Sequence, residues 1–324
     1  MKKINFRVVI TGASSGIGAA TAVAFARQGC TLVLGARGQA GLDDIAARCR
    51  AAGGHAETRV VDVTDAGAVA GFAAQARAML GTIDLWFSDV GIGVLGKYTD
   101  VPVADHAHVI NTNLVSHMND AHAVLPIFLA QGHGIWVNMI SLGGYIASPW
   151  AAAYTASKFG LRGFSAALRG ELHDHPRIHI CDVYPVFVAT PALGHTGNYT
   201  GARLAWPPGA LAPETVADAV VQLARRPRTT TAVGVPAAAL QAGGLANPVA
   251  APLMSRFLAS WSRRADFAPA TTGTMYAPPA TPSGIDGGAR PPGRQGNTAL
   301  AVGAALVAGA IGMLFVRRHV RGRA

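Results

Sequence analysis

The stretch Thr11-Gly12-Ala13-Ser14-Ser15-Gly16-Ile17-Gly18 decides the fold, because an apolar run of strand length at residues 7–10 precedes it and a helical pattern at residues 19–28 follows it. Glycines let the backbone turn sharply and approach a pyrophosphate, and the first N–H groups of the following helix attract that anion. This order of strand, turn and helix predicts the first unit of a dinucleotide-binding domain. The alternative is a turn of small residues that binds nothing. The candidate pyrophosphate-binding residues are Gly12, Ser14, Ser15, Gly16, Ile17 and Gly18.

The same alternation of strands and helices continues along the chain. Further apolar runs of strand length lie at residues 31–34, 59–61, 85–87, 135–139 and 178–183, and helical patterns lie at 42–52, 66–80, 106–131 and 153–173. This rhythm predicts an α/β fold, a single Rossmann-type domain with a doubly wound parallel sheet. Residues 191–212, rich in Gly and Pro, predict a long loop that serves as a substrate lid. Beyond it we expect a strand at 230–235 and a helix at 252–264.

Arg37 follows the second predicted strand and bears on the choice of cofactor. A site for NAD usually carries Asp or Glu at this point to bind the ribose 2′-hydroxyl, whereas an arginine suits the 2′-phosphate of NADP. This chain has Ala36-Arg37 and no acid there. The pattern therefore favours NADP(H) over NAD(H), with a solvated arginine as the alternative.

Three residues could carry proton transfer. Ser141 follows the strand predicted at 135–139, and Tyr154 and Lys158 lie four positions apart in a predicted helix. Residues at this spacing are neighbours on one helix face, so the Lys158 ammonium can stabilise a Tyr154 phenolate. Together with the positive charge of an oxidised nicotinamide, it would lower the pKa of the phenol. Tyr154 would then act as acid and base while Ser141 hydrogen-bonds the substrate oxygen. The alternative is a half-buried tyrosine beside a lysine that reaches to the surface.

Taken together, these motifs resemble the short-chain dehydrogenase/reductase family, in its single-domain branch, over residues 5–235. The resemblance implies that Asp62 and Val63 flank the adenine and that Asn113 holds a water leading from Lys158 to solvent. It also implies that Gly91, Pro185, Val188 and Thr190 contact the cofactor. Residues 227–288 resemble the C-terminal extension of some members of the family.

Two segments depart from the family pattern. The chain has Ser88-Asp89-Val90-Gly91 in place of Asn-Asn-Ala-Gly, and Pro185-Val186 in place of Pro-Gly. The first change puts an acid near the cofactor, and the second puts a β-branched residue where backbone freedom is usual. Neither removes a proton-transfer group, so we expect altered packing or cofactor affinity rather than lost chemistry.

These residues predict an NADP(H)-dependent oxidoreductase that interconverts a secondary alcohol and a ketone. The predicted lid contains apolar and aromatic side chains, which suggests a lipophilic substrate: Leu193, Tyr199, Leu204 and Trp206. The rival hypothesis is a membrane-anchored NADP-binding scaffold or redox sensor with little turnover. The sequence does not decide whether the protein forms a homo-oligomer.

Composition excludes several other classes of protein. Cys30, Cys49 and Cys181 lie far apart, which argues against a disulfide framework or a zinc site, and the scattered histidines form no metal motif. The formal net charge of +10 comes largely from six arginines after Asp286, and no basic stripe in the body predicts nucleic-acid binding.

The C-terminal region predicts attachment to a membrane. We expect a catalytic domain at residues 1–267, a flexible and poorly packed Pro/Gly-rich linker at 268–297, a transmembrane or membrane-anchoring helix at 298–316 and a basic tail at 317–324. As a helix, the uncharged segment would be ~28 Å long against a hydrocarbon core of ~30 Å. The alternative is a buried helix that completes the domain. Because the start of the chain carries no secretory signal, we expect the catalytic domain in the cytoplasm, with the orientation of the helix left open.

Overall fold

The computed structural model describes residues 5–206 and 209–287. A seven-stranded parallel sheet runs through this part of the chain in the order β3-β2-β1-β4-β6-β7-β9. The strands are β1 (Arg7–Thr11), β2 (Thr31–Ala36), β3 (His55–Val60), β4 (Leu85–Ser88), β6 (Gly134–Met139), β7 (Ile178–Pro185) and β9 (Thr230–Val233). Two short strands, β5 (Val94–Leu95) and β8 (Gly197–Asn198), pair separately. The α/β parallel fold predicted from the sequence is confirmed.

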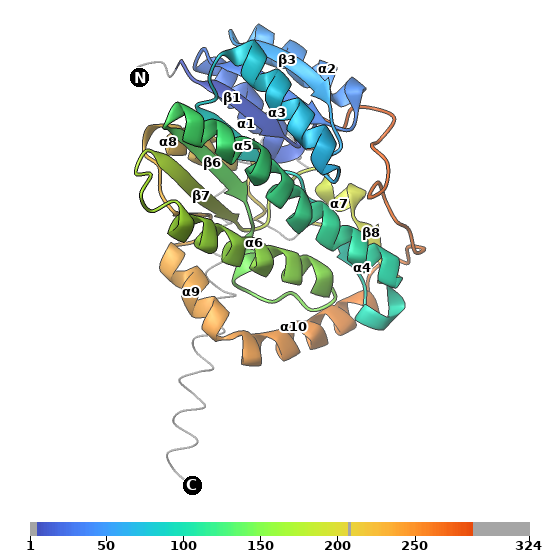
Figure 1. The fold of residues 1–324 in the computed structure, drawn as a ribbon. Helices are drawn as coiled ribbons and strands as arrows, with labels where there is room; N and C mark the ends of the chain where they lie inside the picture. The colour runs from blue at the N-terminus through green and yellow to red at the C-terminus, as the bar shows by residue number, and fades with distance from the viewer. Residues whose placement is uncertain (1–4, 207–208, 288–324) are drawn as a thin grey trace.

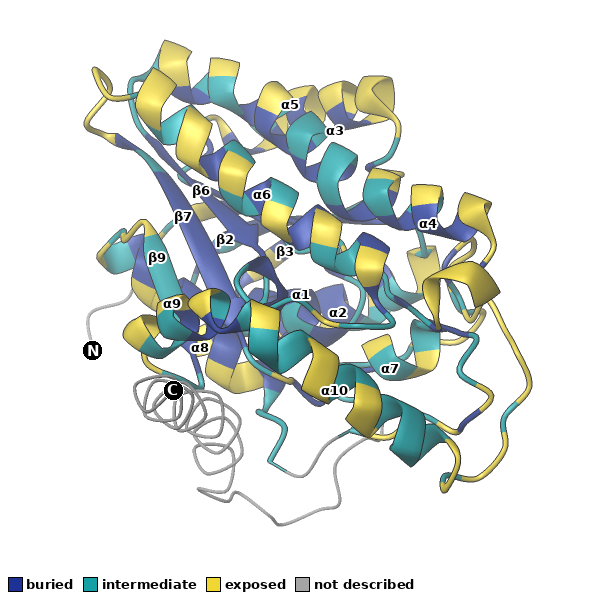
Figure 2. Ribbon diagram, turned by 90° about the horizontal axis from the view of Figure 1, so that it is seen from below, coloured by how far each residue is buried: buried dark blue, intermediate teal, exposed yellow. Residues whose placement is uncertain are grey.

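Helices cover both faces of the sheet (Figures 1 and 2). One layer holds α1 (Gly16–Arg27), α2 (Gln39–Ala51) and α8 (Pro213–Arg225), and the other holds α3 (Ala66–Leu80), α5 (Ser116–Gln131) and α6 (Ala152–Glu171). Because successive side chains of a strand point to opposite faces, Val8 and Ile10 pack under the first layer and Val9 packs under the second. The central strands are therefore mostly apolar, which is why the sequence signals them so clearly.

The third strand is longer than predicted. β3 begins at His55, whereas the apolar pattern marked only residues 59–61. This strand lies at the edge of the sheet and is mostly accessible to solvent, so polar residues such as Glu57 and Arg59 are tolerated in it. A search for apolar runs misses strands of this kind.

The helix predicted over residues 106–131 is present, but it begins at Val103 and contains a π-helical turn that the sequence did not predict. The structure has α4 (Val103–Ile110), a π-helical turn at Asn111–Val115 and then α5. Within the turn, the Ser116 hydroxyl donates to the Thr112 carbonyl oxygen at 2.5 Å. One extra residue per turn shifts the face that each later side chain presents, and such bulges occur often at functional sites.

The predicted lid, residues 191–212, contains some regular structure. It includes α7 (Ala192–His195) and β8, and β8 pairs with β5. Past β9, the helix expected at 252–264 is α10 (Asn247–Ser262), which follows α9 (Ala237–Leu245). α10 lies on the outside of the molecule.

The expectation of a flexible, poorly packed linker is wrong for residues 268–287. Met275 is fully buried, and Thr274, Pro278, Pro279, Thr281, Pro282 and Ser283 line the cavity described below. Residues 288–297, the predicted membrane helix at 298–316 and the basic tail at 317–324 lie outside the described residues. Among the helices that the structure does describe, none combines the length and apolar character needed to cross a membrane.

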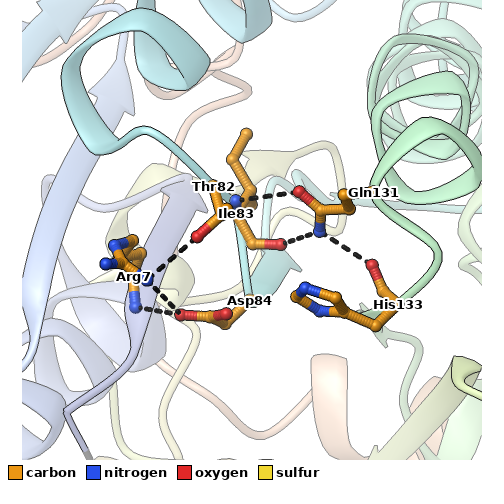
Figure 3. A network of polar contacts seen from close by, with 6 residues as sticks. All are labelled: Arg7, Thr82, Ile83, Asp84, Gln131 and His133. Carbon is orange, nitrogen blue, oxygen red and sulfur yellow. Dashed lines mark hydrogen bonds and ion pairs between the residues drawn. The ribbon is translucent and has the colours of Figure 1, made fainter.

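A polar network ties the loops at the amino-terminal edge of the sheet (Figure 3). Asp84 accepts the backbone N–H of Arg7 at 2.8 Å, and the Arg7 guanidinium donates to Thr82 at 3.0 Å. Gln131, at the end of α5, donates to the carbonyl oxygens of Ile83 at 2.6 Å and of His133 at 2.7 Å. The network joins the starts of β1, β4 and β6 and contains no residue predicted for the site.

Candidate active site

A cavity of about 490 Å³ lies at the carboxyl-terminal edge of the sheet. It spans the position where the strand order reverses between β1 and β4, which is where open α/β sheets bind their ligands. Most of the residues predicted for the site line it: Gly12, Ser14, Ser15, Gly16, Ile17, Arg37, Asp62, Val63, Gly91, Ser141, Tyr154, Lys158, Pro185, Val188 and Thr190. The other two predicted residues, Gly18 and Asn113, do not line the cavity.

The glycine-rich turn fits a pyrophosphate group. Gly12 has a φ of +80°, and a Cβ on Gly18 would come within 2.3 Å of the Gly12 carbonyl oxygen, so neither position accepts a larger residue without a shift. α1 starts directly at this turn, its N-cap Ser15 makes no side-chain cap and its first turn holds no acid. No side chain of α1 caps this end, but the Gly16 N–H donates to the Gly284 carbonyl oxygen at 3.1 Å and the Gly18 N–H donates to the Asp89 carboxylate. An anion that binds at this positive helix end would replace these acceptors.

Arg37 and Asp62 lie near each other in the wall of the cavity. The Asp62 carboxylate accepts the backbone N–H of Thr64 at 2.9 Å and the Thr64 hydroxyl at 2.7 Å. Burial raises the pKa of this carboxyl, but the Thr64 hydrogen bonds and the charge of Arg37 outweigh it and bring the pKa below its usual value. Arg37 Nη1 donates to the carbonyl oxygens of Met275 at 3.2 Å and of Tyr276 at 3.3 Å.

Ser141, Tyr154 and Lys158 also line the cavity and lie together there. Lys158 Nζ lies 5.8 Å from the centre of the Tyr154 ring and donates to the Met139 carbonyl oxygen at 3.1 Å. The Tyr154 hydroxyl is hydrogen-bonded to Ser141. One helix face thus brings the ammonium to the phenol, as the spacing predicted, and the end of β6 brings the hydroxyl.

The expected fall in the Tyr154 pKa is not produced by the protein groups alone. Burial raises the pKa of Tyr154 above its ordinary value, and the Ser141 hydrogen bond opposes this only in part. Burial also lowers the pKa of Lys158 to about 8, although the Asp89 charge raises it. The ammonium lies over the ring rather than against the hydroxyl, so a further positive charge is needed to stabilise the phenolate.

Ser141 is held in a strained backbone conformation. Its φ is +144° and its ψ is 162°, a region that only glycine adopts freely. Its hydroxyl oxygen accepts the N–H of Gly143 at 3.1 Å, and a Cβ on Gly143 would come within 3.1 Å of the Tyr154 ring. The strain directs the hydroxyl at the tyrosine.

The amide nitrogen and the amide oxygen of the Asn113 side chain are both hydrogen-bonded to other protein groups. Its Nδ2 donates to the Ile92 carbonyl oxygen at 2.9 Å and to Ser157 at 3.2 Å, and its Oδ1 accepts the Ile92 N–H at 2.8 Å. The side chain therefore holds the segment at Gly91 against α6. The water relay from Lys158 that the family resemblance implies stays a prediction.

The two departures from the family pattern have structural counterparts. The Asp89 carboxylate accepts the Gly18 N–H, and burial raises the pKa of Asp89 well above its usual value while Lys158 opposes the rise. Val186 is accommodated because residue 234 is glycine, where a Cβ would come within 2.6 Å of the valine side chain. Both changes alter packing around the cavity and leave Ser141, Tyr154 and Lys158 in place.

His117 is a buried group that the sequence did not distinguish from other histidines. Its Nδ1 lies 2.6 Å from Asn138 Oδ1 and its Nε2 lies 2.8 Å from the Val90 carbonyl oxygen. Burial, reinforced by Lys158, lowers the pKa of His117 to about 4, so the ring is neutral and braces the segment beside Gly91. Its position four residues after Asn113, within the helix predicted from the sequence, was the available signal. Within residues 5–206 and 209–287, no three His, Cys, Asp or Glu side chains form a group that could hold a metal ion.

Comparison with known proteins agrees with the geometry of the site. The family model for short chain dehydrogenases matches residues 7–198. The chain is 31% identical to the ketoacyl reductase HetN of Nostoc sp., over 70% of this chain and 77% of that protein. It is 36% identical to the probable oxidoreductase EphD of Mycobacterium tuberculosis over 59% of this chain, but that match spans only 32% of EphD.

Solved structures give the same result. An alcohol dehydrogenase from Thermococcus sibiricus, complexed with 5-hydroxy-NADP, has a TM-score of 0.61 at 25% identity and covers 70% of this chain and 94% of its own. A metagenomic short-chain oxidoreductase in complex with NADP has a TM-score of 0.60 at 30% identity and covers 71% of this chain and 97% of its own. The chain therefore belongs to the short-chain dehydrogenase/reductase family of NAD(P)-dependent oxidoreductases.

Proposed function

We propose that this enzyme uses NADP(H) to interconvert a secondary alcohol and a ketone. The observation that carries the proposal is one continuous cavity lined both by the glycine-rich turn and Arg37 and by Ser141, Tyr154 and Lys158. A dinucleotide laid along it would bring its reactive ring beside the proton-transfer groups. Such positioning accounts for much of the rate of cofactor enzymes.

In this proposal the protein residues handle the proton and the charge. A bound nicotinamide gives or accepts the hydride at its C4 atom. Tyr154 donates its hydroxyl proton to the carbonyl oxygen during ketone reduction and takes a proton back during alcohol oxidation. The Ser141 hydroxyl donates a hydrogen bond to the same oxygen as negative charge develops on it, and Lys158 stabilises the phenolate.

The NADP(H) preference is supported by the charge at the end of β2. Arg37 lines the cavity, and the residue before it is alanine rather than an acid. Two structural neighbours were solved with NADP or a derivative of it. We expect Arg37→Ala to weaken NADPH binding by about 10-fold or more, because one charge-assisted contact is lost, and to change NADH binding by less than about 2-fold. Equal effects on the two cofactors in a fluorescence titration would overturn this preference.

A lipophilic substrate is supported by the side chains around the catalytic end. The cavity wall there includes Leu142, Phe187, Leu193 and Trp206. Two of these, Leu193 and Trp206, come from the predicted lid, and Trp206 donates its indole N–H to the Thr190 carbonyl oxygen at 3.2 Å. The other two apolar lid residues predicted, Tyr199 and Leu204, do not line the cavity. A wall of this kind favours substrates that bury apolar surface.

The test is turnover with the purified enzyme. NADPH oxidation is followed with a panel of ketones of increasing hydrophobicity, from short aliphatic to cyclic and long-chain compounds. We expect activity, with a KM that falls as the apolar area of the substrate grows. Tight NADPH binding without turnover across the panel would overturn the proposal and favour the rival scaffold.

Attachment to a membrane, with the catalytic domain in the cytoplasm, is also part of the proposal. None of the 16 described residues of α10 is buried, and Phe257 is 63% exposed. Residues 219–265 carry arginines but no acid, which suits a surface of anionic lipids. The uncharged segment at 298–316 adds apolar length.

Sedimentation with vesicles tests this attachment. We expect the full chain to pellet with vesicles that contain phosphatidylserine, and Phe257→Ser to reduce the pelleted fraction about 3-fold. Deletion of residues 298–324 should reduce it further. A protein that stays in the supernatant at all lipid concentrations would contradict the proposal.

A further inference from the structure

Residues 274–284, here called the strap, form part of the wall of the cavity. The strap residues that line the cavity are Thr274, Pro278, Pro279, Thr281, Pro282 and Ser283. The residues between the buried Met275 and the turn thus pass over the region where the cofactor is proposed to lie. Three prolines limit the freedom of the free strap, so holding it in one conformation costs less entropy than for an ordinary loop.

The first end of the strap is anchored by Met275. Its side chain is fully buried in a small core with Val94, Val101 and Val109. A Cβ on Gly197 would come within 2.9 Å of the Met275 methyl group, which shows how tightly β8 packs on it. The Met275 carbonyl oxygen is shared by the Arg37 guanidinium and by His108 Nε2, which lies 3.0 Å away.

Tyr276 fastens the strap to α4. Its hydroxyl donates to Asp105 Oδ1 at 2.5 Å, and its ring stacks on His108 with centroids 4.3 Å apart and planes 14° apart. The other oxygen of the same carboxylate, Asp105 Oδ2, accepts the Tyr199 hydroxyl at 2.6 Å. Asp105 itself is buried, at 4% exposure. One carboxylate therefore holds two tyrosines, one from the strap and one from the predicted lid.

The second end of the strap reaches the glycine-rich turn. Ser283 Oγ lies 3.0 Å from His195 Nε2, and the Gly284 carbonyl oxygen accepts the Gly16 N–H at 3.1 Å. The next residue, Ile285, packs against the core beneath α1. Contacts with other parts of the protein therefore fix the strap at both ends.

We propose that the strap is an NADP-specific clamp, in which the carbonyl oxygens of Met275 and Tyr276 orient the Arg37 guanidinium toward the 2′-phosphate of the cofactor. Both carbonyl oxygens accept hydrogen bonds from Nη1 of Arg37. The other N–H groups of the guanidinium would then bind the 2′-phosphate. This holds Arg37 in the geometry that a phosphate needs, so loss of the strap contacts should speed the release of NADPH and leave the release of NADH nearly unchanged. The inference rests on the proposed NADP(H) function, because it names what orients the residue on which the preference depends.

The test is the rate at which each cofactor leaves the full-length protein. NADPH or NADH is bound, an excess of the oxidised form is added, and the loss of nicotinamide fluorescence is followed by stopped flow. We expect Tyr276→Ala, which removes both the stacking and the hydrogen bond, to speed NADPH release about 10-fold or more. Tyr276→Phe keeps the stacking and should give about 3-fold.

The matched control is Tyr199→Phe, which removes the other hydrogen bond to Asp105 without touching the strap. It should change NADPH release by less than 2-fold, and none of the three variants should change NADH release by more than about 2-fold. Equal acceleration of both cofactors, equal effects of the Tyr276 and Tyr199 variants, or no effect of Tyr276→Ala would each overturn the clamp. Failure of the wild-type protein to bind NADPH would instead overturn the proposed function, so the two results are distinguishable.

Discussion

The two edges of the seven-stranded sheet are built from the same strands but differ in their polar chemistry. At the amino-terminal edge, Arg7, Asp84 and Gln131 join neighbouring loops through ordinary hydrogen bonds, several of them open to solvent. At the carboxyl-terminal edge, Ser141 adopts a glycine-only conformation, and Lys158 is buried with a lowered pKa. The polar groups at the amino-terminal edge are hydrogen-bonded without backbone strain. The carboxyl-terminal edge combines a strained backbone with a buried charged group.

This difference shows which edge of the sheet contains groups that are unfavourable for folding. A strained serine and a buried ammonium are each unfavourable for folding, and they persist only when the surrounding structure holds them. Ordinary networks such as the one in Figure 3 are part of that surrounding structure. We therefore expect changes at the carboxyl-terminal edge to alter chemistry or cofactor binding, and changes at the amino-terminal edge to alter stability alone.

The largest effect should come from Tyr154→Phe. Loss of the acid and base should lower kcat/KM by about 10³-fold, while the melting temperature and NADPH affinity stay nearly unchanged, because the ring still fills the same space. Steady-state kinetics and a fluorescence titration measure both quantities. Tyr145→Phe is the matched control, since this tyrosine does not line the cavity, and it should keep full activity. Residual activity within 10-fold of wild type in Tyr154→Phe would contradict the role assigned to the phenol.

Gly18→Ala should come next. The added Cβ would lie 2.3 Å from the Gly12 carbonyl oxygen, so the turn must shift, and we expect NADPH to bind about 10-fold more weakly and the free energy of unfolding to fall by about 1–3 kcal/mol. The control is Gly71→Ala in the middle of α3, where a Cβ meets nothing within 4 Å. That change should stabilise the protein by about 0.5–1 kcal/mol, as alanine does in an exposed helix. Similar results for the two variants would show that the turn is not closely packed.

Two buried groups beneath the carboxyl-terminal edge should give opposite pH dependences of stability. Burial lowers the pKa of His117 from 6.5 to about 4, so its contribution is present above pH 6.5 and is lost as the pH falls toward 4. Burial raises the pKa of Asp120 from 3.8 to about 6 against hydrogen bonds from Thr11 and Ser88, so its contribution is present below pH 3.8 and is lost as the pH rises through 6. In the wild-type protein the two slopes offset each other between pH 4 and 6.

Variants separate the two slopes. Relative to wild type, His117→Gln should gain stability as the pH falls from 6 to 4, and Asp120→Asn should lose it, each by at most about 1.4 kcal/mol per pH unit. Urea unfolding at several pH values measures this. Parallel curves for the three proteins would show that neither group titrates differently in the folded state.

The smallest effect should come from Gln131→Ala at the amino-terminal edge. It removes two donated hydrogen bonds, to the carbonyl oxygens of Ile83 and His133, and should lower the free energy of unfolding by about 1–2 kcal/mol. KM and kcat should not change. Gln75→Ala, which removes one exposed hydrogen bond with Arg59, is the control and should cost less than about 0.5 kcal/mol. If Gln131→Ala lost more activity than its loss of folded protein explains, the amino-terminal edge would affect catalysis as well as stability, which contradicts our expectation.

Much of the fold could be predicted because its signals are local. The buried strands are continuous apolar runs, and the glycine-rich turn between β1 and α1 has a fixed order of residues. The predictions failed where the signal is not local. The edge strand β3 tolerates polar residues, so it has no apolar pattern. The π-helical turn at Asn111–Val115 does not change the apolar pattern either. The strap resembles a linker in sequence because the few residues that fix it lie among prolines and glycines.

The sequence by itself determined the order of strands and helices, the phosphate-binding turn and the spacing of Tyr154 and Lys158, since each depends on residues close together in the chain. Only the tertiary structure decided that Arg37 meets the carbonyls of Met275 and Tyr276, that Asp105 binds two tyrosines and that the Tyr154 pKa is raised by burial. These contacts join residues up to 239 positions apart. Contact and desolvation at such separations are properties of the packed chain, and no local pattern encodes them.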